Sequence, residues 1–199
     1  MKYIIMAAGE GKRWGNYNGI PKHLIEINGE TLLVRTTRLL KENNVDYIIT
    51  SSDERYKQYG EVIPQTYLDC EIDRFEDINE DEICYLYGDV YYTENALKTI
   101  IKTPAEDILF FGSDFEIFAV KVINKQLFME HKNRVKKLYQ KGEINRCIGW
   151  EVYRSLHNIP FEEHCITDRY IYIKDETDDI DYPVDYQRFV DKIQNETKE

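Results

Sequence analysis

The sequence predicts an α/β protein with a mostly parallel β-sheet, and three observations near the amino terminus support this fold class. An apolar segment, 3–6, leads directly into a glycine-rich loop. A helical repeat of apolar residues follows, and a second apolar segment, 45–50, comes after it. Strand, glycine loop, helix and strand is the order in which parallel-sheet proteins begin. A right-handed crossover would place the loop at the carboxyl end of the first strand.

The remaining elements are predicted from spacing and capping residues. After the turn signal Asn28-Gly29, apolar residues recur at helical intervals as far as Leu40, and Asn43-Asn44 ends this helix. We expect Thr93 to cap a later helix and Pro183 to begin the closing one. The other predicted elements are strands over 83–87, 108–111, 117–123 and 170–174, and helices over 94–102, 125–141 and 149–156.

Length and charge limit the classes of function. A chain of 199 residues fits one domain, 1–199, with a substantial core. Its net charge of −11 argues against binding nucleic acid or an anionic membrane through bulk charge. The sequence has no apolar stretch long enough to span a bilayer and no signal-peptide pattern at its start. Acidic residues are concentrated between Asp69 and Glu82, where we expect a solvated loop.

The cysteines show no pattern of a shared site. They are scattered along the sequence, without a CxxC pair or a metal-like spacing to histidine: Cys70, Cys84, Cys147 and Cys165. We therefore expect reduced thiols in a cytoplasmic protein.

The glycine-rich loop does not fit two common phosphate-binding motifs. A dinucleotide fingerprint needs G-x-G-x-x-G, but Gly9-Glu10-Gly11 is followed by two cations and Trp14. The Walker motif G-x-x-x-x-G-K-[ST] is absent from the sequence. The loop must therefore hold its ligand in another way.

The charges of the loop favour a polyphosphate ligand. Glycines let backbone N–H groups close around phosphate oxygens, and Arg13 can add a bidentate guanidinium contact. Lys22 brings a second point charge directly after Pro21. Lys12 fits a phosphate contact and a solvated surface position equally well. We therefore expect a ligand that carries several negative charges.

The start of the chain resembles the A-A-G-x-G-x-R…P-K signature of the nucleotidyltransferases with a glycosyltransferase-A-like fold. The residues that carry the resemblance are Ala7-Ala8-Gly9-Glu10-Gly11-Lys12-Arg13 and, downstream, Pro21-Lys22. This family includes sugar-nucleotide pyrophosphorylases, phosphocholine and methylerythritol-phosphate cytidylyltransferases, and molybdenum-cofactor nucleotidyltransferases. The resemblance implies a Rossmann-like, three-layer α/β/α fold.

The resemblance also implies roles for the residues of the signature. Gly9 and Gly11 would lie against the nucleotide, Arg13 would bind the β- and γ-phosphates, and Lys22 would face the α-phosphate. Arg13 and Lys22 are therefore the expected catalytic residues. The expected nucleotide-binding residues of the loop are Ala7, Ala8, Gly9, Gly11, Lys12 and Arg13.

A nucleotidyl transfer needs Mg²⁺ to offset charge on the α-phosphate and the departing pyrophosphate. Asp89 follows a strand and a glycine, and Asp181 precedes the closing helix. On local grounds Asp89 also fits a turn, and Asp181 a helix N-cap. The segment 180–186 is similar to the family's I-D-x-P-x-D-Y/L segment, so the resemblance implies Asp89 and Asp181 as the metal ligands. Asp179 is the alternative second ligand, and Asp185 is expected to cap or solvate the helix.

The base and the acceptor are less well defined by the sequence. Ser51 and Ser52 follow an early strand and fit either base recognition or a surface turn. The small size of the chain and the lack of a carboxy-terminal repeat domain favour a cytidylyltransferase, by fold-level analogy. The candidate acceptor residues are Glu116, Arg146 and Trp150, with Arg154 one helical turn further on. Trp150 fits a core position as well as an aromatic cage.

The leading hypothesis is a Mg²⁺-dependent transfer of a nucleoside monophosphate, with CMP favoured, from an NTP to a small phosphorylated metabolite. A role in polysaccharide biosynthesis would suit this chemistry. The expected partners are the NTP and the acceptor, and the sequence leaves open whether the protein is a monomer or a homodimer. The alternatives are a glycosyltransferase that uses a nucleotide sugar and a nucleotide-binding regulator without turnover.

Overall fold

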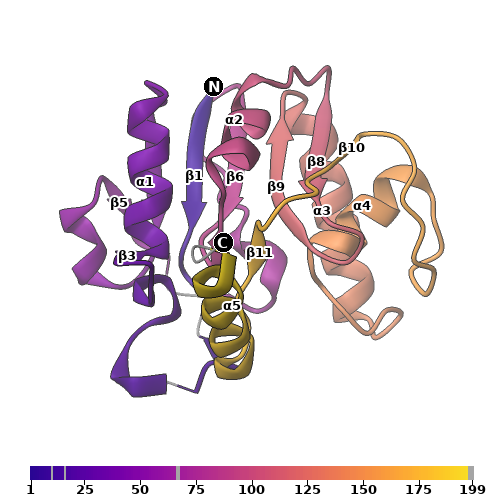
Figure 1. Ribbon diagram of the computed structural model, residues 1–199. Helices are drawn as coiled ribbons and strands as arrows, with labels where there is room; N and C mark the ends of the chain where they lie inside the picture. Colours follow the sequence, from indigo (N-terminus) through magenta and orange to yellow (C-terminus); the bar gives the residue numbers. More distant parts are fainter. Residues whose placement is uncertain (10, 16, 66–67, 197–199) are drawn as a thin grey trace.

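A seven-stranded sheet in the order β10-β8-β9-β6-β1-β4-β5 forms the centre of the protein (Figure 1). The computed structural model describes residues 1–9, 11–15, 17–65 and 68–196. Strand β9 runs antiparallel to both of its neighbours, and the other strand pairs are parallel. The predicted mostly parallel sheet is therefore confirmed. The strands are β1 (Lys2–Met6), β4 (Tyr47–Thr50), β5 (Val62–Ile63), β6 (Ile83–Tyr87), β8 (Ile108–Gly112), β9 (Ile117–Val122) and β10 (Tyr170–Tyr172).

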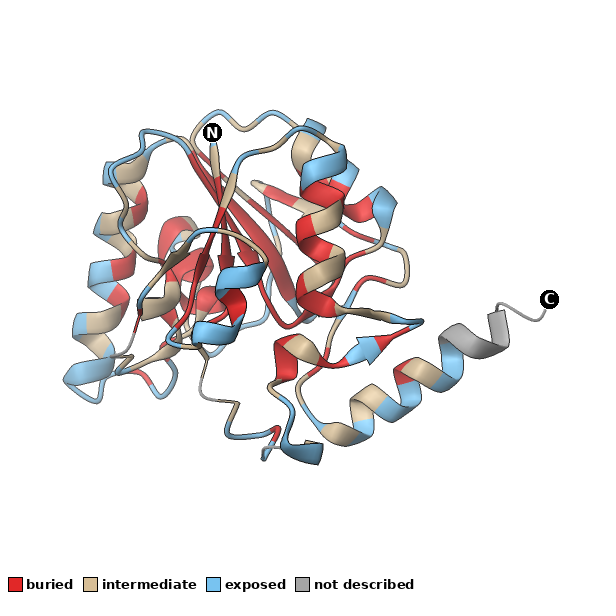
Figure 2. Ribbon diagram, turned by 90° about the vertical axis from the view of Figure 1, so that its left-hand side faces the viewer, coloured by how far each residue is buried: buried red, intermediate tan, exposed pale blue. Residues whose placement is uncertain are grey.

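Helices lie on both faces of this sheet, as Figure 2 shows. Strands β6 and β9 are buried along their whole length, because helices cover both faces, and so their sequences are almost continuously apolar. None of the described helices combines the length and the apolar character needed to cross a membrane. The helices are α1 (Leu32–Glu42), α2 (Glu94–Lys102), α3 (Lys125–Gln140), α4 (Gly149–His157) and α5 (Pro183–Glu196).

The parallel strands at the centre of the sheet end at a common edge. Met6, the last residue of β1, is in register with Thr50 of β4 and with Tyr87 of β6. The segments that follow these strands therefore emerge side by side, at the carboxyl edge where ligands bind in open α/β sheets.

A small antiparallel ribbon brings the end of the chain to this edge. Strand β7 (Val90–Tyr91) pairs with β11 (Asp178–Asp179), and the amide of Ile180 donates to the carbonyl of Asp89 over 3.1 Å. The residues before α5 consequently lie beside the residues after β6, although they are far apart in the sequence.

The strongest local predictions agree with the structure. Thr93 caps α2 by accepting from the amide of Ala96, and Asn44, at the end of α1, has the left-handed φ of 55°. Asn28-Gly29 forms the turn of a hairpin between β2 (Glu26–Ile27) and β3 (Glu30–Thr31).

The prediction of a solvated loop between Asp69 and Glu82 is wrong in its first half. A 3₁₀ helix, Glu71–Arg74, forms there, and Ile72 and Phe75 are buried in the core. The alternation of acidic residues with apolar ones at i and i+3 explains why this segment packs against the domain.

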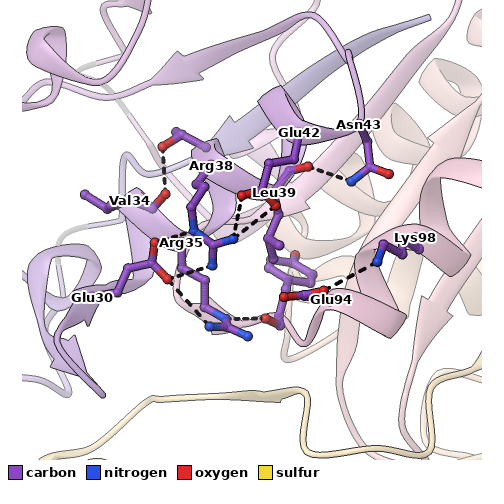
Figure 3. A network of polar contacts seen from close by, with 11 residues as sticks. Glu30, Val34, Arg35, Arg38, Leu39, Glu42, Asn43, Glu94 and Lys98 are labelled. Carbon is purple, nitrogen blue, oxygen red and sulfur yellow. Dashed lines mark hydrogen bonds and ion pairs between the residues drawn. The ribbon is translucent and has the colours of Figure 1, made fainter.

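A group of ion pairs on α1 braces the helix against its surroundings; we call it the α1 ion network (Figure 3). The guanidinium of Arg38 binds both carboxylate oxygens of Glu30, over 2.7 and 2.9 Å, and reaches Glu42 over 3.0 Å. Arg35 donates from Nε to the carbonyl of Tyr92 over 2.6 Å. These contacts connect α1 with β3 and with the segment before α2.

Candidate active site

A cavity of about 910 Å³ opens at the carboxyl edge of the sheet. Its walls come from the glycine-rich loop, from the segments after β4 and β6, and from the segment before α5. The structure brings the sequence-predicted site residues to this cavity, with the exception of Arg154: Ala7, Ala8, Gly9, Gly11, Lys12, Arg13, Lys22, Ser51, Ser52, Asp89, Glu116, Arg146, Trp150 and Asp181, together with Asp179.

The loop after β1 is held in place from both sides. The amide of Ala7 donates to Thr50 over 2.9 Å, and Gly11 adopts a φ of +60° that favours glycine. Trp14, which stands where a dinucleotide motif has glycine, is buried and donates from its indole to the carbonyl of Ile20 over 2.8 Å. The tryptophan therefore anchors the loop in a small apolar cluster beneath it.

Two aspartates converge on one lysine at the centre of the cavity. The ammonium of Lys22 lies 2.8 Å from Asp89 and 2.8 Å from Asp181, and only 8% of Lys22 is exposed. Arg13 binds the other carboxylate oxygen of Asp181. We call Asp89 and Asp181 the carboxylate pair. Asp181 thus forms ion pairs with Arg13 and Lys22. Asp185 instead accepts from the amide of Tyr182 and caps the start of α5.

The close approach of β6 to β1 explains the glycine before Asp89. A Cβ atom on Gly88 would lie 2.6 Å from the carbonyl of Met6, so the backbone has no room for a side chain there. The chain can then turn directly after β6 and present Asp89 to Lys22.

Charge neighbours keep this centre ionised. Burial opposes the charge of Asp89, but Lys22 and Arg74 outweigh it and hold its pKa well below the usual range. Burial likewise opposes the charge of Lys22, yet the two aspartates raise its pKa above the ordinary value. Asp89 is therefore held in its ionised form, and both aspartates contact cations.

Two further carboxyl groups in the cavity behave differently. Desolvation, reinforced by the neighbouring Asp181 carboxylate, raises the pKa of Glu116 to about 7. Desolvation and the Glu116 carboxylate raise the pKa of Asp179 to about 8. Within the described residues, no three metal-ligating side chains are grouped, and Asp181, not Asp179, shares Lys22 with Asp89.

Arg74 is a site residue that sequence reasoning missed. Its guanidinium is 3.1 Å from the carboxylate of Glu71, lies over the ring of Tyr87 at 5.4 Å, and has 12% of its side chain exposed. A Cβ on Gly9 would be only 3.5 Å from its Nη1, so this cation lies beside the glycine loop. The sequence feature that could have pointed to Arg74 is its position as a lone arginine between Ile72 and Phe75, within an otherwise acidic segment.

His23 is a second residue without a predicted role. It is buried, its Nδ1 lies 3.0 Å from the hydroxyl of Tyr56, and burial lowers its pKa to about 4. His23 is therefore neutral near pH 7 and fixes the short helix that carries Lys22.

The segments expected to bind the base and the acceptor have mixed outcomes. The hydroxyl of Ser51 is buried and donates to the carbonyl of Ala7 over 3.1 Å, so it serves the turn, while Ser52 is exposed to the cavity. Trp150 packs on Tyr170 and also lines the cavity. Arg154 does not line it, because its guanidinium donates to the carboxylate of Glu151 and to the backbone carbonyl of Glu163.

The fold and the site can be compared with those of known proteins. The first strand runs into a glycine loop with Arg13 and Lys22, opposite two aspartates, which is the arrangement that the resemblance implies. The MobA-like NTP transferase domain family matches this chain over residues 3–84. This match covers less than half of the chain, and it agrees with the resemblance noted from the loop.

One curated relative and several solved structures are similar to the chain. A bifunctional IPC transferase and DIPP synthase of Thermococcus kodakarensis is 43% identical over 70 residues. This match covers 35% of the chain and 16% of the relative, so the chain corresponds to about one sixth of that protein's length.

Solved nucleotidyltransferase structures match nearly the whole chain. The inositol-1-phosphate CTP transferase of T. maritima is 13% identical with a TM-score of 0.58, covering 97% of this chain and 96% of its own. The CTP:phosphocholine cytidylyltransferase of Streptococcus pneumoniae is 17% identical with a TM-score of 0.56, covering 96% and 98%. At these identities the likeness shows a shared fold.

Proposed function

We propose that the protein transfers CMP from CTP to a small phosphorylated metabolite and releases pyrophosphate, with Mg²⁺ as the metal. The observation that carries this proposal is the meeting of Lys22, Asp89 and Asp181 within hydrogen-bond distance, beside a cationic glycine loop. A polyphosphate needs the cations, and a divalent metal needs the carboxylates.

The loop and its cations account for binding of the triphosphate. The backbone around Gly9 and Gly11 can approach phosphate oxygens closely, because neither residue has a side chain. Arg13 lies at the mouth of the cavity with its guanidinium next to Asp181, where it can turn to the β- and γ-phosphates. Lys22, deeper in the cavity, would face the α-phosphate.

The carboxylate pair fits Mg²⁺. Magnesium is bound by one or two carboxylates, with phosphate and water completing its coordination. Asp89 and Asp181 provide two hard oxygen donors that already share one cation, Lys22. When bound there, Mg²⁺ would neutralise charge on the phosphates of the nucleotide.

The reaction needs no nucleophile from the protein. A phosphate oxygen of the acceptor attacks the α-phosphorus of CTP, forming a new O–P bond as the bond to the β-phosphate oxygen breaks. The residues of the chain position both substrates and stabilise charge: Lys22 at the α-phosphate, and Arg13 at the departing pyrophosphate. Arg74, beside Gly9, adds a third cation to this surface.

The relatives support CTP as the nucleotide and a polar phosphate ester as the acceptor. The two solved enzymes use CTP with inositol-1-phosphate and with phosphocholine, by their names. In this chain Glu116 and Asp179 lie in the same cavity and can accept hydrogen bonds from acceptor hydroxyls or face a cationic group. Arg146, exposed at the rim, can contact the acceptor phosphate.

Two measurements test the proposal. In a thermal-shift experiment with Mg²⁺ and each NTP, CTP should give the largest rise in melting temperature, because the nucleotide that binds most tightly stabilises the folded protein most. A ligand at about 100 times its Kd stabilises by about 2.7 kcal/mol. Pyrophosphate release should then appear with CTP and one member of a panel of inositol, choline, polyol and sugar phosphates.

Three outcomes would contradict the proposal. Consumption of a sugar nucleotide without pyrophosphate would indicate a glycosyltransferase. Tight NTP binding with the nucleotide unchanged would indicate a regulator. No pyrophosphate with any NTP across the panel would reject the proposed transfer.

A further inference from the structure

Two cysteines that are 77 positions apart in the sequence meet at the wall of the cavity. The Sγ atoms of Cys70 and Cys147 lie 2.7 Å apart, with the Cys147 thiol donating to Cys70. All four cysteines are free thiols, as expected from the sequence, but nothing in the sequence indicated that Cys70 and Cys147 are in contact. The chain folds them together because the 3₁₀ helix Glu71–Arg74 packs against the segment that leads into α4.

The backbones around the two thiols are also connected. The amide of Ile72 donates to the carbonyl of Cys147 over 3.3 Å, and the amide of Gly149 donates to the carboxylate of Glu71 over 3.3 Å. These contacts hold both cysteines in place independently of the sulfurs. The two sulfur atoms thus face each other across a fixed junction between two walls of the cavity.

The distance between the sulfurs is close to a covalent one. A disulfide bond is about 2.05 Å long, so the sulfurs need to approach by only about 0.7 Å, which small side-chain rotations can supply. We propose that Cys70 and Cys147 are a modification site, which a low-molecular-weight disulfide such as oxidised glutathione converts to an intramolecular disulfide.

The exposure of the two thiols sets the order of the reaction. Cys70 is half-buried and lines the cavity, whereas only 4% of Cys147 is exposed. Oxidised glutathione can therefore reach Cys70 first. The Cys70 thiolate attacks one glutathione sulfur, forms a mixed disulfide, and releases the other glutathione as a thiolate.

The second step closes the bridge. The Cys147 thiolate attacks the sulfur of Cys70, the Cys70–Cys147 bond forms, and the second glutathione thiolate leaves. The protein loses two electrons and two protons, and each of the two molecules of reduced glutathione takes up one electron and one proton. Cys84 is buried in the sheet and Cys165 is exposed elsewhere, so neither competes for this bond.

The bridge would fix the cavity wall without altering the charge centre. It joins the segment that carries Glu71 and Arg74 to the segment that carries Arg146 and Trp150. Lys22 and the carboxylate pair lie outside the cross-linked segments. We therefore expect the oxidised protein to be more stable to heat and to keep its cavity open.

The experiment uses the full chain with and without excess oxidised glutathione. Burial raises the pKa of both thiols, so the incubation is run at about pH 8.5. After oxidation and denaturation, two of the four thiols should be unreactive, and the intact mass should fall by that of two hydrogen atoms. Peptide mapping should recover one cross-linked product containing Cys70 and Cys147.

Matched variants separate this pair from the other cysteines. Cys70→Ala and Cys147→Ala should each abolish the loss of two hydrogens and the rise in melting temperature, while Cys165→Ser should retain both. The proposal is overturned if four thiols remain titratable in the wild type, or if glutathione stays attached to Cys70. Because thiols and mass are measured without substrate, the result does not depend on the proposed enzymatic activity.

Discussion

The protein has two groups of ion pairs that look alike in composition and differ in what they do. In the α1 ion network, the Arg38 side chain is 36% exposed and binds Glu30 and Glu42 on the surface. In the cavity, the Lys22 side chain is 9% exposed and binds Asp89 and Asp181. Water screens the first group and is largely excluded from the second.

This difference in environment predicts a structural role for the first group and a functional role for the second. In the α1 ion network, the hydrogen bonds from Arg38 hold the pKa of Glu30 below its ordinary value. In the cavity, by contrast, Glu116 and Asp179 have raised pKa values beside an ionised Asp89. Carboxyl groups shifted in opposite directions within one cavity are typical of functional sites. We expect substitutions in the two groups to separate activity from stability.

The largest effect is expected at Lys22. In the proposed transfer, Lys22→Ala removes the cation that would face the α-phosphate, so pyrophosphate release from CTP and the acceptor should fall by about 10²–10³-fold. Asp89→Asn should cause a comparable loss and raise the Mg²⁺ concentration needed for half-maximal rate, because it removes one carboxylate of the pair. Steady-state rates measured over a Mg²⁺ titration would check both variants.

Arg38→Ala is the matched control for these variants. It removes a cation that binds two carboxylates but lies outside the cavity, so its turnover should equal that of the wild type. Circular dichroism and melting temperature would verify that all three variants are folded. A folded Lys22→Ala protein with the wild-type rate would show that the site has been misplaced.

A smaller effect is expected on the stability of the ligand-free protein with pH. The pKa of Asp179 is raised from its ordinary value of 3.8 to about 8. The pKa of Glu116 is raised from its ordinary value of 4.5 to about 7. The folded state therefore favours their protonated forms. This stabilisation is complete below the ordinary values and is lost as pH rises through about 7 and then about 8.

Urea unfolding between about pH 6.5 and about pH 8.5 would measure this loss. The midpoint should decrease with rising pH in the wild type, and Asp179→Asn should flatten the decrease. Glu116→Gln should flatten it less, because Glu116 is more exposed and solvent screens its charge. His23 titrates below this window, since its pKa is lowered to about 4. Parallel curves for wild type and Asp179→Asn would refute the assignment.

The parts of the molecule that follow local rules could be predicted from the sequence. Strand β1, the loop cations Arg13 and Lys22, and the cap at Thr93 depend on neighbours within a few residues. The sequence also singled out Asp89 and Asp181, because each directly follows or precedes an element with a clear signal, and both line the cavity. Their meeting could be expected from the resemblance, but the ribbon of β7 and β11 that produces it is too short to give a periodic pattern.

Tertiary packing determined the features that were missed. Arg74 lies in an acidic segment whose local composition indicates a loop, and it becomes part of the cavity only because Ile72 and Phe75 pack into the core. Cys70 and Cys147 have no local relation at all, and only the packing of two distant segments joins them. Arg154 had suitable chemistry and spacing, but its helix directs it inward, toward Glu151.

The smallest effect is expected for the stability of Arg38→Ala. The side chain makes a two-pronged contact with Glu30 and an i,i+4 contact with Glu42, yet it is partly exposed and screened by water. Exposed pairs of this kind contribute about 0.2–1 kcal/mol each, so the free energy of unfolding should fall by about 1 kcal/mol or less. Added salt should reduce the difference further, because it screens surface charges. Urea unfolding at low and high salt would test this, and a salt-independent loss above about 2 kcal/mol would mean that the α1 ion network is a buried structural element.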